Sequence, residues 1–260
     1  MTTESRREAK LSQFCHDYVA ARRPGFGYCF RYPGRSLSAL VAIRRLPSLR
    51  AGPFDNVEGT AIRAELSRGS VVRRVIFPLM AVLRLPPGPG QYDLGSSKQT
   101  LRRKIRRAQR LGVGWAKVVE PEEQQKLLQL AAGWEQMHPA VHPRTPPVDH
   151  SSLLRYRLWL AAYSADGRPL LLSVTPVERE WALLYYFHSL AAGEEASNAR
   201  YLMTQVLVEH LIALGVRYLI DPASPLGLTN GLRHYQRMLG FRLVRFHLAP
   251  CRRSWTIERP

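Results

Sequence analysis

The sequence predicts an α/β fold of the α+β type, in which a mixed, mostly antiparallel sheet is flanked by helices. Short runs rich in Val, Ile and Leu alternate apolar with polar residues, which is typical of strands. Longer segments carry apolar residues every three or four positions, which is typical of helices. The chain of 260 residues is long enough for one large domain or two interlocked ones.

The overall charge is strongly positive. The 38 Lys and Arg residues against 20 Asp and Glu give a formal net charge of +18. A field of that sign attracts polyanions such as nucleic acid, anionic lipid headgroups or phosphorylated substrates. An Arg-rich proteome would raise the same count without any partner, so charge alone does not identify one.

The remaining composition excludes several classes of protein. Cys15, Cys29 and Cys251 are too few and too scattered to predict a disulfide framework or a zinc site, so we expect a reducing, cytoplasmic setting. No run of about eighteen apolar residues is present, which predicts no membrane span. The N-terminus is polar and charged and does not resemble a signal peptide.

Residues 1–90 are predicted to form a first domain, a mixed α/β half. Its expected elements are a helix over about 7–21, a turn-rich piece at 24–28, and strands over 37–45, 60–66 and 71–85. The Pro- and Gly-rich run 86–90 is the strongest breaker in the sequence. We therefore place the start of the second domain, 91–260, directly after it.

A basic helix is predicted at the start of the second domain, over 97–111. Seven of the thirteen residues from Lys98 to Arg110 are Lys or Arg, and none is acidic. The apolar residues Leu101, Ile105, Ala108 and Leu111 form one stripe of a helix. Ser96 or Ser97 is expected to cap its N-terminus and Gly112 its C-terminus.

Two interpretations of this helix remain open. Like charges one turn apart cost a few tenths of a kcal/mol per pair, so an anionic partner that repays this cost is the first interpretation. A solvated, Arg-rich surface helix is the second. If the partner is a nucleic acid, the candidate contacts are Lys98, Arg102, Arg103, Lys104, Arg106, Arg107 and Arg110.

From residue 113 onward, the predicted order is strand, helix, three antiparallel strands, helix, strand, helix and strand. These elements are expected over 113–119, 121–137, 157–163, 169–177, 181–190, 198–214, 216–220, 231–239 and 241–248. The loop over 137–152 holds His138, His142, Asp149 and His150, whose spacing matches no standard ligand pattern. We therefore predict no metal site.

Two stretches of the second domain, 198–221 and 230–241, carry a resemblance to a known family. The segment 233–241 reads RHYQRMLGF. Together these stretches resemble the closing half of a GNAT-superfamily acyltransferase, in which a helix follows the central strand and the next strand ends near the active site. The resemblance implies a GNAT-like fold, with two GNAT-like halves of which the second is complete, and an acyl transfer to an amine.

The sequence departs from the acyl-CoA-dependent members of that superfamily in two places. Those enzymes carry a Gln/Arg-x-x-Gly-x-Gly/Ala loop whose amides bind pyrophosphate, whereas residues 191–200 read AAGEEASNAR, with one glycine and two carboxylates. Acetyltransferases often place a tyrosine, which protonates the departing thiolate, four residues before the final glycine. Gln236 occupies that position, and Tyr235 lies one residue earlier.

At both places the sequence more closely resembles the Fem-type aminoacyltransferases and their peptidoglycan-type and cellulose-locus-type relatives, which lack the CoA loop. That group often has a basic Ser-Lys-x-x-Arg-Arg-x-Ile-Arg-Lys-Ala helix, to which 97–108 is similar. It also has an Asp at the end of the preceding strand, here Asp221. Its last helix commonly reads aromatic-Lys-x-x-aromatic-Gly, and Gln236 replaces the Lys. The resemblance covers about residues 95–248.

Acyl transfer to an amine needs a base for the nucleophile, donors for the oxyanion and a proton for the leaving group. The candidate catalytic residues are Asp221, Tyr235 and Gln236, although an Asp before Pro is equally typical of a turn. The candidate substrate-binding residues are Tyr186, His188, Asn198, Arg200, Arg233 and Arg237. Strand alternation should place Tyr186 and His188 on one face and Tyr185 on the other.

Three functions remain open from the sequence. The first is transfer of an aminoacyl group from aminoacyl-tRNA to a small-molecule or peptide amine, which the missing CoA loop, the basic helix and the net charge favour. The second is an N-acyltransferase that uses acyl-CoA or a carrier thioester. The third is a non-catalytic GNAT-like module that binds nucleic acid. We expect no tightly bound cofactor, only aminoacyl-tRNA or acyl-CoA as co-substrate.

Overall fold

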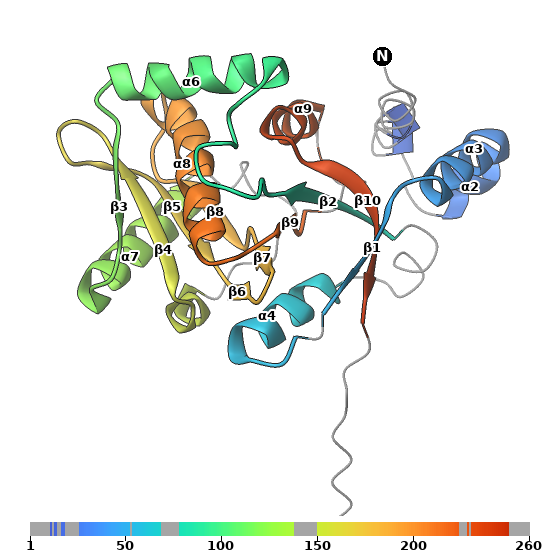
Figure 1. Ribbon diagram of the computed structural model, residues 1–260, viewed down its shortest axis with the longest axis horizontal. Coiled ribbons are helices and arrows are strands. Elements are labelled where there is room, and N and C mark those ends of the chain that lie inside the picture. The colour runs from blue at the N-terminus through green and yellow to red at the C-terminus, as the bar shows by residue number, and fades with distance from the viewer. Residues whose placement is uncertain are drawn as a thin grey trace, which may run out of the picture. The chain divides into compact units, whose positions relative to one another are not determined.

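A computed structural model describes residues 11, 13, 14, 17, 18, 26–52, 54–68, 78–137, 150–223, 228 and 230–249 (Figure 1). The chain divides into two units. Unit 1 comprises residues 1–81, 223–233 and 242–260, and unit 2 comprises 82–222 and 234–241. The division into domains 1–90 and 91–260 stays a prediction. None of the described helices is long and apolar enough to cross a membrane.

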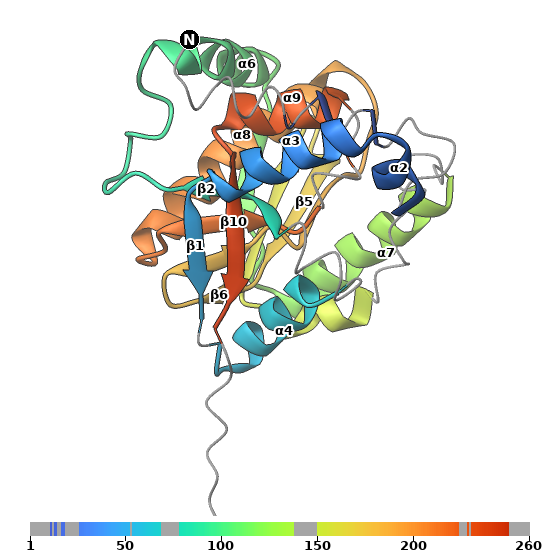
Figure 2. The same cartoon turned by 90° about the vertical axis from the view of Figure 1, so that its right-hand side faces the viewer.

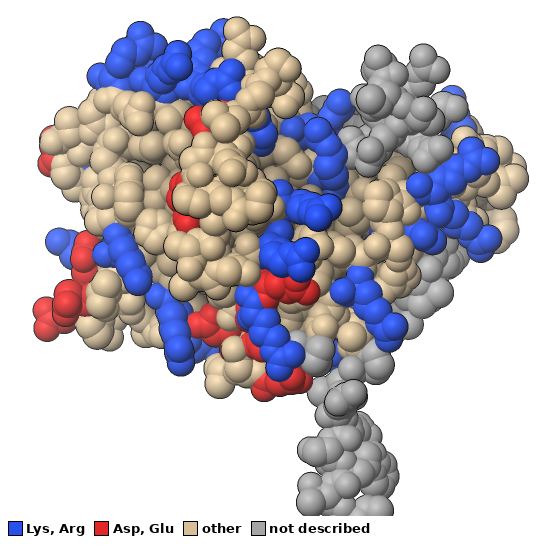
Figure 3. Space-filling view, viewed as in Figure 1, with Lys and Arg blue, Asp and Glu red and all other residues tan. Residues whose placement is uncertain are grey.

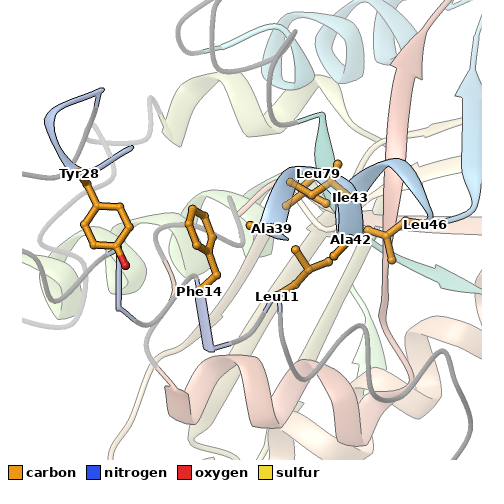
Figure 4. Close-up of a cluster of buried hydrophobic side chains, with 8 residues drawn as sticks. All are labelled: Leu11, Phe14, Tyr28, Ala39, Ala42, Ile43, Leu46 and Leu79. Atoms are coloured by element: carbon orange, nitrogen blue, oxygen red, sulfur yellow. The ribbon is translucent and has the colours of Figure 1, made fainter. Parts of the chain in front are cut away.

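Unit 1 is built around a pair of parallel strands. Its elements are α2 (Phe26–Arg31), α3 (Pro33–Arg44), β1 (Ser48–Ala51), α4 (Val57–Leu66), the start of β2 (Leu79–Arg84) and β10 (Arg242–Leu248). β1 pairs with β10, with Ser48 opposite Arg245 (Figure 2). Phe246 N donates to Pro78 O at 2.7 Å, which places β2 next to β10. A cluster of buried side chains from α3 and the chain around it forms the core (Figure 4).

The strands expected over 37–45 and 60–66 are wrong, because both segments are helices. α3 begins with Pro33, which suits the first turn of a helix, and buries Ala39, Ala42 and Ile43 along one face. α4 begins after Asn56, whose side-chain oxygen accepts a hydrogen bond from Gly59 N at 2.6 Å. Their content of Val, Ile and Leu suggested strands, but the buried positions follow the helical period.

The other expectations for unit 1 have mixed outcomes. The turn expected at 24–28 is wrong from Phe26 onward, where α2 begins. Of the helix expected over 7–21, residues 11, 13, 14, 17 and 18 are helical, and the others lie outside the described residues. β2 confirms the end of the strand expected over 71–85, whereas 71–77 lie outside the described residues.

Unit 2 contains an antiparallel sheet in the order β3-β4-β5-β8. Its strands are β3 (Gly114–Lys117), β4 (Leu158–Tyr163), β5 (Pro169–Thr175) and β8 (Tyr186–Ser189). α7 (Pro121–Met137) and α8 (Glu194–Ala213) cover its opposite faces (Figures 1 and 2). Because both faces are covered, β4 and β5 are buried along almost their whole length. The predicted class, a mixed α/β fold with sheets flanked by helices, is confirmed.

A second group of strands in unit 2 runs in the order β2-β9-β7-β6. β9 (Tyr218–Asp221) pairs in parallel with β7 (Trp181–Leu183), and β7 pairs antiparallel with β6 (Val177–Glu178). α9 (Asn230–Leu239) follows β9 in the chain, and its second half belongs to unit 2. The predicted order of elements after residue 113 is confirmed, except that the strand expected over 181–190 is divided into β7 and β8 and that the two-residue strand β6 was not predicted.

The helix ends of unit 2 confirm some predicted caps and correct others. α6 (Gln99–Arg110) ends as predicted, since Gly112 has φ +74° and Val113 N donates to Ala108 O at 3.1 Å. The predicted serine cap is wrong: Ser96 and Ser97 lie in the short 3₁₀ helix η1 (Ser96–Lys98), and no side chain caps α6. α8 begins at Glu194 instead of residue 198, because glutamates suit a first helical turn.

Candidate active site

The strand expected over 181–190 is divided in two near its middle. Its first part, β7, pairs with β9, and Leu184 N still donates to Ile220 O at 2.8 Å. At Tyr185 the backbone N donates to Leu183 O at 2.7 Å, and the chain then continues as β8, which pairs with β5. β8 therefore lies at one edge of its sheet, and β3 lies at the other. An edge strand offers main-chain donors and acceptors to an extended ligand.

Two candidate catalytic residues are in direct contact. The side-chain amide Nε2 of Gln236 donates to Asp221 Oδ2 at 2.6 Å. Gln236 is buried in α9, and Asp221 is half-buried as the last residue of β9. Because an amide is neutral, Gln236 itself adds no positive charge beside the carboxylate. This arrangement orients a carboxylate that can bind an ammonium group or accept a proton from it.

The side chain of Tyr235 points to α8, whereas that of Gln236 contacts Asp221 of β9. Its hydroxyl lies 3.4 Å from the carbonyl oxygen of Arg200 and 3.5 Å from Thr204 Oγ1. The Arg200 guanidinium lies 5.1 Å from the centre of its ring, and the ring of Tyr201 packs edge-on at 5.2 Å. Burial raises the pKa of Tyr235. The structure thus places Tyr235 between α8 and α9, where it also holds the two helices together.

The buried tyrosines predict a loss of stability at alkaline pH. Burial raises the pKa values of Tyr92, Tyr186 and Tyr235. A tyrosine whose pKa is higher in the folded state than in the unfolded state contributes its full stabilisation below the ordinary tyrosine pKa of about 10. This stabilisation is lost as the pH rises through the folded-state pKa. We expect a thermal midpoint that does not respond to these groups below about pH 10 and falls above it.

Tyrosinate absorbance followed together with circular dichroism tests this prediction. The absorbance of these residues should rise together with the loss of structure. Ionisation of every tyrosine at its ordinary pKa while the protein stays folded would contradict it. The Tyr186→Phe variant removes one of the three groups and should make the alkaline decline less steep.

The N-terminus of α8 is occupied by carboxylates. Glu194 accepts two hydrogen bonds from Arg107 of α6, at 2.7 and 3.1 Å, and these lower the pKa of Glu194. Glu195 pairs with Arg168 at 3.1 Å. The positive end of the helix dipole therefore already faces two negative charges. A pyrophosphate at this position would have to compete with these two carboxylates for the helix amides and for Arg107 and Arg168.

Asn198 and Arg200 lie one and two turns into α8 and hold buried polar atoms. The Asn198 side chain is buried, and its amide donates to Glu194 O at 2.9 Å. Neither Asn198 Oδ1 nor Arg200 Nε has a hydrogen-bond partner among the described residues. Such atoms lose hydration on burial, so a ligand acceptor or donor that reached them would satisfy them.

The first turns of α6 are fastened to the end of α9 and to the preceding loop. Lys98 Nζ donates to Leu239 O at 2.5 Å and lies 4.2 Å from the ring centre of Tyr92. The Tyr92 hydroxyl donates to the same carbonyl at 2.7 Å. Arg102 donates to the carbonyl oxygens of Asp93 and Gly95. These cations therefore serve as intramolecular hydrogen-bond donors.

The outer face of α6 carries the other cations. Leu101, Ile105 and Ala108 are buried as predicted. Arg103, Arg106, Arg107 and Arg110 are exposed, Lys104 is half-buried, and together they form the dense basic patch at the top of Figure 3. Within the described part of the chain, no carboxylate pairs with Arg103 or Arg106. These two arginines are therefore available to an anionic partner, whereas Arg107 is bound to Glu194.

Tyr186 and His188 share a face of β8, as strand alternation predicts. Their rings are 4.4 Å apart, whereas Tyr185 packs against Tyr156. The buried Tyr186 hydroxyl donates to Glu135 Oε1 of α7 at 2.9 Å. The ring of His150 packs against Tyr186, and its Nε2 lies 3.4 Å from Glu135 Oε2.

Sequence reasoning missed Glu135. It lies four residues after Ala131 and eight after Leu127, so it occupies the apolar stripe of α7. A carboxylate on an apolar stripe is costly unless it is paired, and that position was the available signal.

The remaining predicted site residues are placed as follows. Arg233 is buried in α9, and Arg237 is exposed in its last turn. Among the described residues no group of three His, Cys, Asp or Glu side chains could hold a metal ion. His138, His142 and Asp149 lie outside the described residues.

Comparison with known proteins finds similarity to solved structures only. No protein-family description matches the chain, and no curated protein matches its sequence. The C-terminal DUF2156 domain of an Agrobacterium fabrum protein, described as a lysylphosphatidylglycerol synthetase, matches at 16% identity with a TM-score of 0.49. L-PGS from Bacillus licheniformis matches at 15% identity with a TM-score of 0.46. A conserved protein of unknown function from Bacteroides thetaiotaomicron VPI-5482 matches at 14% with 0.49.

These matches cover part of each protein. They include 64%, 68% and 70% of this chain in the same order. They include 57%, 62% and 63% of the solved chains, so this chain spans about three fifths of the length of each.

Proposed function

We propose that this protein is an aminoacyltransferase that moves an aminoacyl group from aminoacyl-tRNA to an amine. The observation that carries the proposal is the junction between α6 and α8. There Arg107 of the basic helix binds Glu194 at the helix end where an acyl-CoA-dependent enzyme would hold pyrophosphate. The donor phosphates then have to be bound elsewhere, and the exposed arginines of α6 adjoin that junction.

A tRNA donor fits this arrangement of charge. Its acceptor stem presents phosphates along a helix, and Arg binds phosphate with a planar pair of donors. Arg103, Arg106 and Arg110 are exposed on one helix, with buried Leu101 and Ile105 holding that helix in place. The proposed contact is with the phosphate backbone, which gives affinity without reading the base sequence.

The proposed chemistry uses the Asp221–Gln236 pair. The amine nitrogen of the acceptor attacks the ester carbonyl carbon of the aminoacyl group, a C–N bond forms, and the ester C–O bond breaks. Asp221 accepts the proton that the amine loses and returns it to the ribose oxygen of the tRNA, which leaves as a hydroxyl group. Gln236 holds Asp221 in position through the 2.6 Å hydrogen bond. A Lys in this place would add a positive charge next to Asp221, whereas Gln236 adds none.

Paired binding assays distinguish this donor from acyl-CoA. We expect a mobility shift with tRNA that weakens steeply as salt is added, and no increase in the thermal midpoint with CoA. Charged tRNA mixed with the protein and a pool of amines should then lose its amino acid faster than without the protein. Stabilisation by CoA without tRNA binding would instead assign the protein to the acyl-CoA-dependent transferases. Binding of tRNA without any loss of the amino acid would assign it to the non-catalytic modules.

A further inference from the structure

The first two helices of unit 1 expose three large apolar side chains. Phe30 of α2 is 83% exposed, and Leu37 and Val41 of α3 are 63% and 40% exposed. We call Phe30, Leu37 and Val41 the α2–α3 outer face. Single exposed apolar residues are ordinary, but three within twelve positions of two consecutive helices need an explanation.

These side chains point away from the core of unit 1. Each lies two positions from a core residue of the same helix: Phe30 from Tyr28, Leu37 from Ala39, and Val41 from both Ala39 and Ile43. Two positions turn an α-helix by about 200°, so the two sets occupy opposite sides. Figure 4 shows Tyr28, Ala39 and Ile43 in the cluster that the inner side builds. Among the described residues of unit 1, the α2–α3 outer face therefore lies on the side of the two helices opposite the core cluster.

The charge around this face is mostly positive. No Asp or Glu occurs from residue 18 to residue 54, a stretch that contains seven arginines. Arg31 and Arg44, at the ends of α2 and α3, are exposed, and no carboxylate among the described residues pairs with them. Arg35 pairs with Asp17 at 3.2 Å. The surface is therefore apolar in its middle and cationic at its rim.

We propose that the α2–α3 outer face docks on an anionic lipid bilayer. A cationic helix with exposed Phe and Leu lies in the membrane interface, its apolar side chains at the acyl boundary and its arginines at the headgroups. A second copy of this chain fits less well, since a symmetric contact would bring arginines against arginines. Nucleic acid offers phosphates for the rim but no apolar surface for Leu37 and Val41. This inference goes beyond the proposed transferase function and does not depend on it.

Vesicle sedimentation tests the proposal with the full chain. We expect the protein to sediment with vesicles in which about a third of the phosphatidylcholine is replaced by phosphatidylserine, and much less with phosphatidylcholine alone. The triple variant Phe30→Ser, Leu37→Ser, Val41→Ser should bind the anionic vesicles at least about tenfold more weakly. Added salt should weaken binding of the wild type by screening the arginines.

A matched variant in unit 2 controls for the general loss of apolar surface. Val119→Ser, Leu130→Ser and Met137→Ser change three other exposed apolar side chains, and this variant should sediment like the wild type. Equal binding of the wild type and the α2–α3 variant would overturn the proposal, as would no binding to either kind of vesicle. A concentration-dependent dimer that only the α2–α3 variant loses would assign the face to a second copy. A loss of tRNA binding by that variant, with vesicle binding intact, would assign it to RNA.

Discussion

Asp221→Asn is expected to lower the rate of aminoacyl transfer by about 10²- to 10⁴-fold while leaving tRNA binding unchanged. Asn keeps the size of Asp and can still hydrogen-bond to Gln236, which lies 2.6 Å away, so the local fold should survive. It cannot accept a proton or balance the charge of an ammonium group. Single-turnover loss of a labelled amino acid from tRNA, measured with saturating protein, isolates this step from donor binding.

The same chemical change at an exposed turn provides the control. Asp166 lies in the turn between β4 and β5, where its side chain accepts a hydrogen bond from Ser164. Asp166→Asn should therefore retain the wild-type rate. A full transfer rate in Asp221→Asn would remove Asp221 from the proposed chemistry and leave its bond to Gln236 as a structural contact.

Charge reversal at Arg103 and Arg106 of α6 has the largest expected effect on donor binding. The double variant Arg103→Glu, Arg106→Glu should bind tRNA about 10- to 100-fold more weakly at moderate salt. The slope of log affinity against log salt concentration should also become less negative by about 2, because two phosphate contacts are lost. Its thermal midpoint should change little, since both side chains are exposed and no carboxylate of the described residues pairs with them.

A control of equal charge separates a local contact from the general field of the protein. Lys117 on β3 and Lys126 on α7 are exposed, and their double change to Glu alters the net charge by the same amount. That variant should keep most of its tRNA affinity and the original salt slope. Equal losses in the two variants would mean that the overall positive charge, and not α6, attracts the donor.

The sequence predicts unit 2 well because its signals are strong and mutually consistent. α7 runs from Pro121 to Met137 as expected, since Pro121 marks its start and a regular apolar stripe continues to its last turn. Gly112 and Gly240 both adopt the positive φ that ends a helix. Unit 1 is harder, because α3 and α4 contain the Val and Ile residues that strands prefer.

The contacts that define the candidate site could not be predicted from the same patterns. Tyr186 and Glu135 are 51 residues apart, and Lys98 and Leu239 are 141 apart. Such pairs depend on how helices pack on the sheets, which periodicity does not describe. For the same reason, the sequence cannot separate the cations of α6 that bind within the protein from those that face outward.

The bond between Lys98 and Leu239 has a consequence for mutational scans. Lys98 belongs to the helix that carries the exposed arginines, and Leu239 ends the helix that carries Gln236. Loss of Lys98 would release the end of α9 at Leu239. Gln236, which holds Asp221, lies only three residues before Leu239 in the same helix, so its position would also become less fixed. A mutational scan that ranks residues by lost activity would then rank Lys98 together with the proposed catalytic residues Asp221 and Gln236. Only separate measurements of donor affinity and of the single-turnover rate would show that Lys98 has a structural role.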